Sequence, residues 1–308
     1  MLPPQSSKKL FFQVSNFYAS RTGRVRDERF GSTGQTAMPL FLQRRYLNEE
    51  SDSRQKNWVH LRDLMAVLVA RDFKVRYKRS VLGIAWSLLV PLAQLAVLYV
   101  VFNNMLRLNI PHFSSFLLTG ILPWTWFQSS LMTSSTAIVE NRELVKQVGF
   151  PVGVLPCVSV LSQLVHFLLA MPILAGFLLA DGFRPTFALL ALPIVMIVQF
   201  FLSVSAAYIL ATLQVKFRDT QYLLGIFLFL FFYVTPVFWD GSSLPPAYAK
   251  IMKFNPVAGL LNGYRDILMR GQWPDVKPMA AVACISSILA IVCFFLFLRS
   301  RDRFVEEL

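Results

Sequence analysis

The chain has 308 residues, of which 55% are hydrophobic and 15% are charged, and its formal net charge at pH 7 is +13. A soluble domain carries about 25% charged residues, so this composition argues against an ordinary soluble enzyme. The apolar content also excludes a disordered chain, and three cysteines are too few for a disulfide scaffold. We therefore expect one basic membrane domain.

Residues 1–56 are polar and mixed in charge. This composition predicts a disordered or weakly structured cytoplasmic extension, and a plain tail is favoured over a partner-docking segment. Lys8 and Lys9 precede only three apolar residues, which is too short a run for the hydrophobic region of a signal peptide.

Apolar residues recur at helical spacing from Trp58 to Phe73, and Asn57 is suited to cap the start of this helix. Charged residues occupy its other faces. The segment is too short and too charged to cross a membrane. We predict an amphipathic helix over residues 57–79 that lies in the cytoplasmic interface.

The end of this helix is strongly basic. Its candidate binding residues, at the mouth of the first apolar stretch, are Arg71, Lys74, Arg76, Tyr77, Lys78 and Arg79. One interpretation is a topology signal that also contacts anionic lipid. The other is a cradle for the phosphate-bearing head of a substrate.

Six later stretches of at least 20 residues contain no Asp, Glu, Lys or Arg. Each is long enough for one membrane-spanning helix, which needs about 20 apolar residues. The predicted spans are residues 83–103, 115–136, 154–179, 187–213, 221–239 and 279–298. A β-barrel would need alternating apolar and polar residues, and runs such as 228–232 do not alternate.

The distribution of basic residues predicts the orientation. Of the 30 Lys and Arg residues, 23 fall before the first span, in the loops after spans 2 and 4, and after span 6. Because cytoplasmic segments carry the excess of Lys and Arg, both termini are expected in the cytoplasm. The even number of spans agrees with this orientation.

Two loops show helical patterns of their own. The loop after span 2 suits a short helix ended by Gly149 and Pro151, either docking a partner or simply connecting two spans. The 38 residues from Asp240 to Lys277 contain two short apolar runs, at 247–254 and 257–269, separated by Asn255-Pro256. We predict two half-helices that re-enter the outer leaflet, in which Arg265 and Asp266 need pairing or water.

Aromatic residues gather toward the predicted outer halves of the spans. Candidates to stack on sugar rings in a channel are Tyr99, Phe102, Phe116, Trp124, Trp126, Tyr233, Phe238 and Trp239. The competing interpretation for each of them is a lipid-facing belt or ordinary helix packing.

Catalytic chemistry is not evident in the sequence. It has no phosphate-binding Gly-x-x-x-x-Gly-Lys-Ser/Thr loop, no nucleophile–base constellation and no cysteine spacing typical of metal sites. His166 lies inside a predicted span, and we expect it to be a hydrogen-bonded structural residue. The chain is therefore predicted not to be an enzyme, and energy for transport would come from a partner.

Four stretches carry a family resemblance. They are Arg71–Trp86, Asn141–Pro151, Phe217–Thr220 followed by Thr235–Val237, and Asn255-Pro256 with Tyr264-Arg265. In this order they resemble the ABC-2 type permease family, specifically its exporters of O-antigen, capsule and teichoic acid. The first stretch is the most specific, and the resemblance covers residues 57–298, with 80–308 as the transmembrane domain.

The resemblance implies a homodimer of six-helix subunits in a bacterial inner membrane, with two copies of a separate ATPase that binds ATP and Mg. No cofactor in this chain and no nucleic acid are implied. Residues implied to contact the ATPase are Asn141, Arg142, Glu143, Leu144, Val145, Lys146 and Phe150. Spans 1, 2 and 5 of both copies would line a channel for a glycan on an undecaprenyl-type lipid, whose diphosphate would meet the basic run.

Three alternatives remain open. Teichoic acid or capsule export is the nearest to O-antigen export. An ABC-2 drug or small-lipid exporter shares the fold, but the Arg71–Trp86 stretch argues against it. A membrane glycosyl- or acyltransferase would need polar residues at catalytic spacing, and we find none in the sequence.

Overall fold

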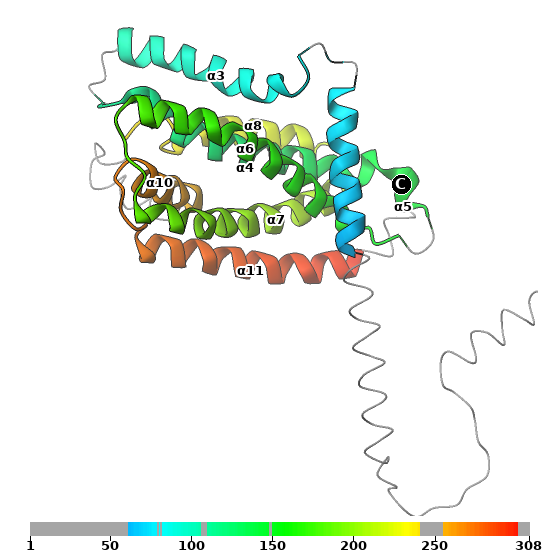
Figure 1. Cartoon of the computed structure of the whole chain (residues 1–308). Coiled ribbons are helices and arrows are strands. Elements are labelled where there is room, and N and C mark those ends of the chain that lie inside the picture. Colours follow the sequence, from blue (N-terminus) through cyan, green and yellow to red (C-terminus); the bar gives the residue numbers. More distant parts are fainter. Residues whose placement is uncertain are drawn as a thin grey trace, which may run out of the picture. The chain divides into compact units, whose positions relative to one another are not determined.

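The computed structural model describes residues 61–78, 80, 82–105, 110–147, 150–240 and 255–300. All of them belong to one compact unit, Val59–Leu308. The regular structure in these ranges is helical, without a strand, which confirms the all-α prediction for this part of the chain (Figure 1). The 1–56 extension, Arg79 and the predicted half-helix at 247–254 lie outside the described residues.

The helices follow the predicted order. A helix over residues 61–77 comes first. It is followed by η1 (Gly83–Ala85), α3 (Trp86–Tyr99), the π-helical turn η2 (Val100–Met105), α4 (Phe113–Glu140), α5 (Arg142–Val145), α6 (Val154–Ala180), η3 (Phe187–Ala191), α7 (Leu192–Lys216), α8 (Thr220–Val234), α10 (Pro256–Leu268) and α11 (Val276–Ser300).

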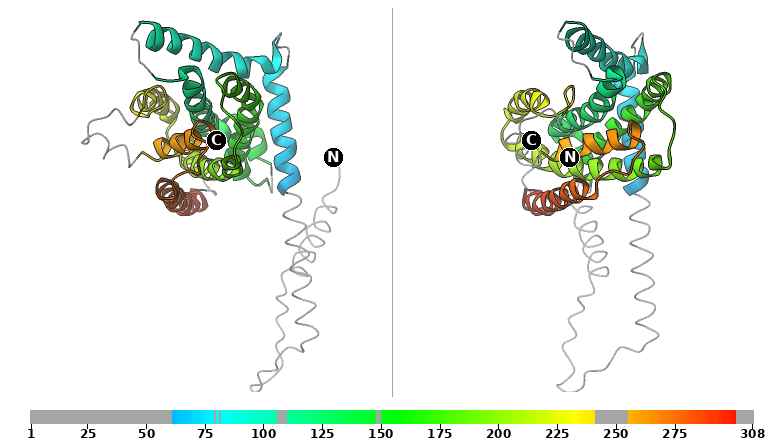
Figure 2. Two further views of the ribbon diagram at one scale, coloured as in Figure 1. Left: turned by 60° about the vertical axis from the view of Figure 1, so that its left-hand side comes forward. Right: turned by 90° about the vertical axis from the view of Figure 1, so that its left-hand side faces the viewer.

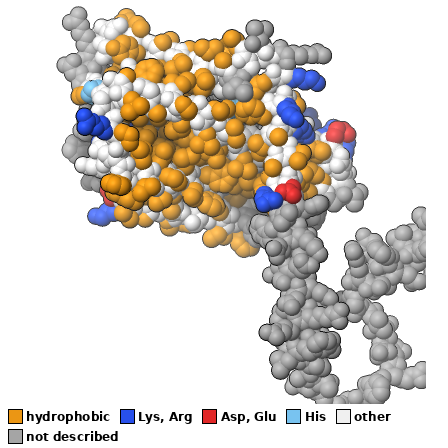
Figure 3. Space-filling model, in the orientation of Figure 1, with side chains coloured by type: hydrophobic (Ala, Val, Ile, Leu, Met, Phe, Trp, Pro, Cys, Tyr) orange, Lys and Arg blue, Asp and Glu red, His pale blue; other side chains and the backbone are white. Residues whose placement is uncertain are grey.

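Four helical segments of the described chain are long and apolar enough to cross a membrane, namely Trp86–Met105, Val154–Ala180, Phe187–Lys216 and Val276–Cys293. They coincide with the first, third, fourth and sixth predicted spans. The surface in Figure 3 is mainly hydrophobic, and the charged side chains on that face gather near its two ends. Both observations agree with a membrane protein.

α4 is the centre of the bundle, where it packs against α3, α6, α7, α8 and α10. It has 28 residues, of which 20 are buried, and it carries ten Ser and Thr residues. Its hydroxyls can donate to backbone carbonyls of the same helix, as Thr133 does to Ser129 at 2.7 Å. A helix covered by other helices tolerates this polarity, which explains why α4 is long enough to span but less apolar than the four segments above.

The fifth predicted span is shorter than expected. The prediction placed a helix at 221–239, but α8 ends at Val234. Thr235 precedes Pro236 and has an extended backbone (φ −84°, ψ 139°), because a residue before proline is disfavoured in the helical region. The 15 residues of α8 extend about 22 Å, which is less than the thickness of the hydrocarbon core.

The helix over 61–77 runs across one end of the bundle (Figures 1 and 2). Its apolar side joins a cluster made by the end of α4, the start of α6 and the end of α7. Its arrangement across the bundle end agrees with the amphipathic helix that the periodicity predicts.

Candidate functional site

The site lies where the 61–77 helix meets the bundle end. Leu68 is buried there with Val145 and Val158, and Leu61, Leu64, Met65 and Val69 pack around them. Met65 follows Leu61, Val69 follows Met65 and Leu68 follows Leu64 by four positions each, so these side chains line one face of the helix. Burial of this face fixes the helix against the loop between α4 and α6.

A hydrogen bond joins the basic run to that loop. Nη2 of Arg71 donates to Oδ1 of Asn141 at 2.6 Å, and Nδ2 of Asn141 donates to the carbonyl of Ala137 at 2.8 Å. Arg71 also pairs with Asp72 at 3.3 Å. From the sequence, Arg71 was a candidate for phosphate binding and Asn141 for the ATPase contact. The structure brings the two residues into contact.

The last turn of the 61–77 helix is held against α6. The guanidinium of Arg76 faces the side-chain amide of Gln163, whose oxygen accepts from Nη1 at 3.3 Å and Nη2 at 3.0 Å in the amide orientation that satisfies both groups. The hydroxyl of Tyr77 lies 3.1 Å from Nδ1 of His166, and Phe73 stacks on the same imidazole. His166 is therefore a hydrogen-bonded residue, as predicted.

The basic residues consequently fall into two groups. Arg71 and Arg76 bond to the bundle, although Arg76 is also exposed. Lys74 and Lys78 are exposed as well. An ammonium group on a flexible stem can reach a phosphate as a point charge, so the two lysines are the members of the run best placed to meet one.

The predicted coupling segment follows α4 directly. Its described residues form one short helix, α5, after Asn141. Arg142, Glu143 and Lys146 are exposed, Leu144 and Phe150 are partly buried, and Val145 is 3% exposed. The segment thus presents three charged side chains outward, while Val145 anchors it to the bundle.

The candidate channel aromatics occupy different environments. Phe116, Trp124, Trp126 and Phe238 are buried in the core cluster, Tyr99, Phe102 and Trp239 are partly buried, and Tyr233 is 53% exposed. Phe102, Phe232 and Tyr233 all contact the ring of Phe238. Within one chain, the four buried rings contribute to helix packing, and Tyr233 is the candidate most available to a ligand.

Arg265 is a buried cation of α10, with 2% of its surface exposed. Its Nη2 donates to the carbonyl of Val237 at 2.8 Å, and its guanidinium carbon lies 3.8 Å from the ring centroid of Phe116.

The predicted need for pairing in this helix is met. Asp266 bonds to Arg270 at 2.6 Å. Asn255 caps α10, with its side chain accepting from the backbone of Val257 and Ala258, and Pro256 stands in the first turn. The carbonyl that Arg265 binds belongs to the segment after α8, so α10 supplies the donor that the interrupted helix lacks.

Gln163 was not predicted as part of the site, and it is one of the residues that hold the 61–77 helix. The only signal in the sequence is its position as an amide in a charge-free span, which indicates a buried hydrogen bond without naming the partner. Among the described residues, no group of three or more His, Cys, Asp or Glu side chains could hold a metal ion.

Comparison with known proteins adds the family. The model of the ABC-2 type transporter family matches residues 63–269. An O-antigen export system permease protein, RfbA, from Myxococcus xanthus is 34% identical over 249 residues, covering 80% of this chain and 96% of the relative. Its namesake from Klebsiella pneumoniae is 33% identical over 82% of this chain and 97% of the relative.

A more distant similarity is to the polysialic acid transport protein KpsM of Escherichia coli, which is 23% identical over 76% of this chain and 92% of the relative. The family match covers most of the 61–77 helix, the loop after α4 and α10. With the apolar helices described above, it identifies a multi-pass membrane permease: the chain belongs to the ABC-2 type transporter family.

Proposed function

We propose that this chain is the channel-forming subunit of an ATP-driven exporter that moves lipid-linked polysaccharide of the O-antigen type across the bacterial inner membrane. The observation that carries the proposal is the contact between Arg71 and Asn141, which links a basic helix end to the loop expected to meet the ATPase. The names of the Myxococcus and Klebsiella relatives supply the substrate class.

The working unit in this proposal is a homodimer with two copies of a separate ATPase, which binds ATP and Mg. Arg142, Glu143 and Lys146 form the exposed part of the ATPase contact. ATP-driven closure moves α5, and the Arg71–Asn141 bond passes this movement to the amphipathic helix. The bond is one way in which the two states of the transporter can differ.

The basic helix end then receives the lipid diphosphate. Lys74 and Lys78 meet its charge, while Arg71 and Arg76 hold the helix in position. Arg79 completes the run in the sequence. Charge-assisted contacts to phosphate oxygens are strong, and they require no covalent chemistry from the chain.

The fold in this proposal has six spans, with α4 and α8 joining the four apolar segments, and both termini are cytoplasmic. The 28-residue length of α4 supports the second span. α8 is short, but the chain continues after it as Thr235–Trp239, where the carbonyl of Val237 accepts a hydrogen bond from Arg265. In this arrangement α10 is a re-entrant half-helix, and spans 1, 2 and 5 of both copies line the channel, with Tyr233 facing the glycan.

The test is reconstitution of the chain with its ATPase in proteoliposomes that contain lipid-linked glycan. We expect ATP hydrolysis to be stimulated by the lipid-linked glycan and the glycan to be transferred across the bilayer. The free polyprenyl phosphate and an apolar drug serve as comparison substrates. Stimulation by the drug alone would contradict the proposal in favour of an ABC-2 drug exporter.

Capsule export is the second candidate, and the similarity to KpsM favours it. A capsular polysaccharide and an O-antigen on their own lipid carriers can be compared in the same assay. Preferential transfer of the capsular polymer would select the second candidate.

A further inference from the structure

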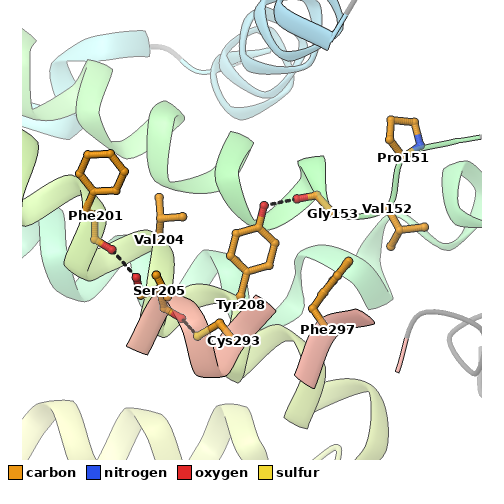
Figure 4. Close-up of a pocket in the computed structure, with 10 residues that line it drawn as sticks. Pro151, Val152, Gly153, Phe201, Val204, Ser205, Tyr208, Cys293 and Phe297 are labelled. Atoms are coloured by element: carbon orange, nitrogen blue, oxygen red, sulfur yellow. Dashed lines mark hydrogen bonds between the residues drawn. The ribbon is translucent and has the colours of Figure 1, made fainter. Parts of the chain in front are cut away.

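A pocket of about 500 Å³ lies between the start of α6 and the helices α7 and α11 (Figure 4). Its wall includes Gly153 before α6, Phe201, Val204 and Tyr208 from α7, and Ala290 and Phe297 from α11. Its volume falls within the range of small-molecule sites, which is about 300–1,000 Å³. None of the candidate residues of the proposed transport site lines it.

The side chains that line the pocket present mainly apolar atoms to a ligand. The hydroxyl of Tyr208 donates to the carbonyl of Gly153 at 2.5 Å. Ser205, also in the wall, donates to the carbonyl of Phe201 at 2.7 Å, and the thiol of Cys293 donates to the carbonyl of Ser205. Because these polar groups already donate to the backbone, the pocket selects an apolar occupant.

The surroundings of the pocket are those of a lipid site. α7 and α11 both belong to segments that are long and apolar enough to cross a membrane. Phe201 is 56% exposed and Ala290 is exposed, so the pocket opens on the outside of these two helices. In a bilayer, the molecules at that surface are lipid chains.

Charge indicates which lipid. Phe297, at one end of the pocket, is followed two positions later on α11 by Arg299. In the proposed orientation this is the cytoplasmic end of α11, where basic residues attract anionic headgroups. We propose that the pocket binds one acyl chain of an anionic bilayer phospholipid whose phosphate lies at this end of α11.

The pocket also adjoins the start of α6. A Cβ on Gly153 would approach the ring of Phe297 to 3.2 Å, so α6 begins close to α11 at this point. Gly153 follows Phe150, the last residue of the predicted coupling segment, by three positions. The pocket therefore lies directly after that segment, at the start of α6.

The experiment places the full-length chain in nanodiscs with a trace of phosphatidylglycerol that carries a photoactivatable diazirine on one acyl chain. After irradiation, the labelled peptides are mapped by mass spectrometry. We expect labelling of residues 201–208 and 290–297. Ala290→Trp fills the pocket and reduces this labelling about tenfold, equivalent to about 1.4 kcal/mol of binding.

Ala280→Trp is the matched control, because Ala280 is also exposed on α11 but does not line the pocket. Val204→Phe is a second filling variant, for use if Ala290→Trp does not elute as the folded protein. Labelling that both filling variants leave unchanged overturns the proposal.

Two further probes test the identity of the lipid. A diazirine phosphatidylcholine probe is expected to label the pocket several-fold less than phosphatidylglycerol, and equal labelling overturns the preference for an anionic head. A diazirine polyprenyl phosphate probe distinguishes the lipid carrier of the substrate. Preferential labelling by this probe overturns the assignment to a bilayer phospholipid.

Discussion

Arg71 and Asn141 are 70 positions apart in the sequence, and a hydrogen bond of 2.6 Å joins them. The arginine belongs to the amphipathic 61–77 helix, and the asparagine stands between α4 and α5. In the proposed transporter, this bond connects the substrate entrance to the contact with the ATPase.

We predict that loss of this bond weakens coupling. Arg71→Ala and Asn141→Ala are each expected to reduce glycan-stimulated ATP hydrolysis about fivefold. The reason is that removing one hydrogen bond at a half-exposed site costs about 1 kcal/mol. The double variant should be no worse than either single variant, because both remove the same interaction. Arg62→Ala is the control, since Arg62 is exposed and contacts only the adjacent Asp63 among its described hydrogen bonds. Additive effects of the two substitutions would contradict the linkage.

Glu143→Lys is predicted to uncouple ATP hydrolysis from export. Glu143 is exposed on α5, so reversal of its charge changes the partner surface without disturbing the packing. Expression and thermal stability in detergent should stay as in the wild type, while transport falls.

Val145→Asp, unlike Glu143→Lys, is expected to lower thermal stability in detergent. Val145 is 3% exposed, and an unpaired carboxylate there costs stability. If Glu143→Lys exports glycan at the wild-type rate, α5 does not form part of the ATPase contact.

The two exposed lysines are predicted to act by charge. Lys74→Ala with Lys78→Ala should raise the concentration of lipid-linked glycan needed for half-maximal ATPase stimulation. This effect should shrink at high ionic strength, because salt screens exposed charges. Arg76→Ala should also weaken stimulation but should be less sensitive to salt, since Arg76 bonds to Gln163. If neither substitution changes stimulation, the basic run is a topology signal only.

Gly120 and Arg265 are predicted to be critical for the attachment of α10. A Cβ on Gly120 would collide with the carbonyl of Val237 and approach Nη2 of Arg265 to 3.1 Å. Gly120→Ala and Arg265→Met should therefore each lower stability by about 2 kcal/mol or more, measured as thermal unfolding in detergent.

Gly176→Ala is the matched control, because nothing lies within 4 Å of a Cβ at that helical position. If Gly120→Ala melts at the wild-type temperature, the close approach of α4 to the segment after α8 does not constrain the fold.

The sequence located the long apolar helices well because charged side chains are costly in hydrocarbon. Charge-free runs therefore mark α3, α6, α7 and α11 within a few residues. The same reasoning extended α8 too far, since Thr235–Trp239 is also free of charge. The proline at 236 was the local signal for the earlier end of the helix.

Tertiary structure alone decided which polar groups meet. Helical spacing predicted the apolar face of the 61–77 helix, but neither the bond from Arg71 to Asn141 nor the approach of Tyr77 to His166 follows from local pattern. The sequence indicated that Arg265 needed a partner, and only the fold identified the carbonyl of Val237 and the ring of Phe116. Local composition determines whether a segment is helical and apolar, whereas the pairing of distant side chains depends on how the helices pack.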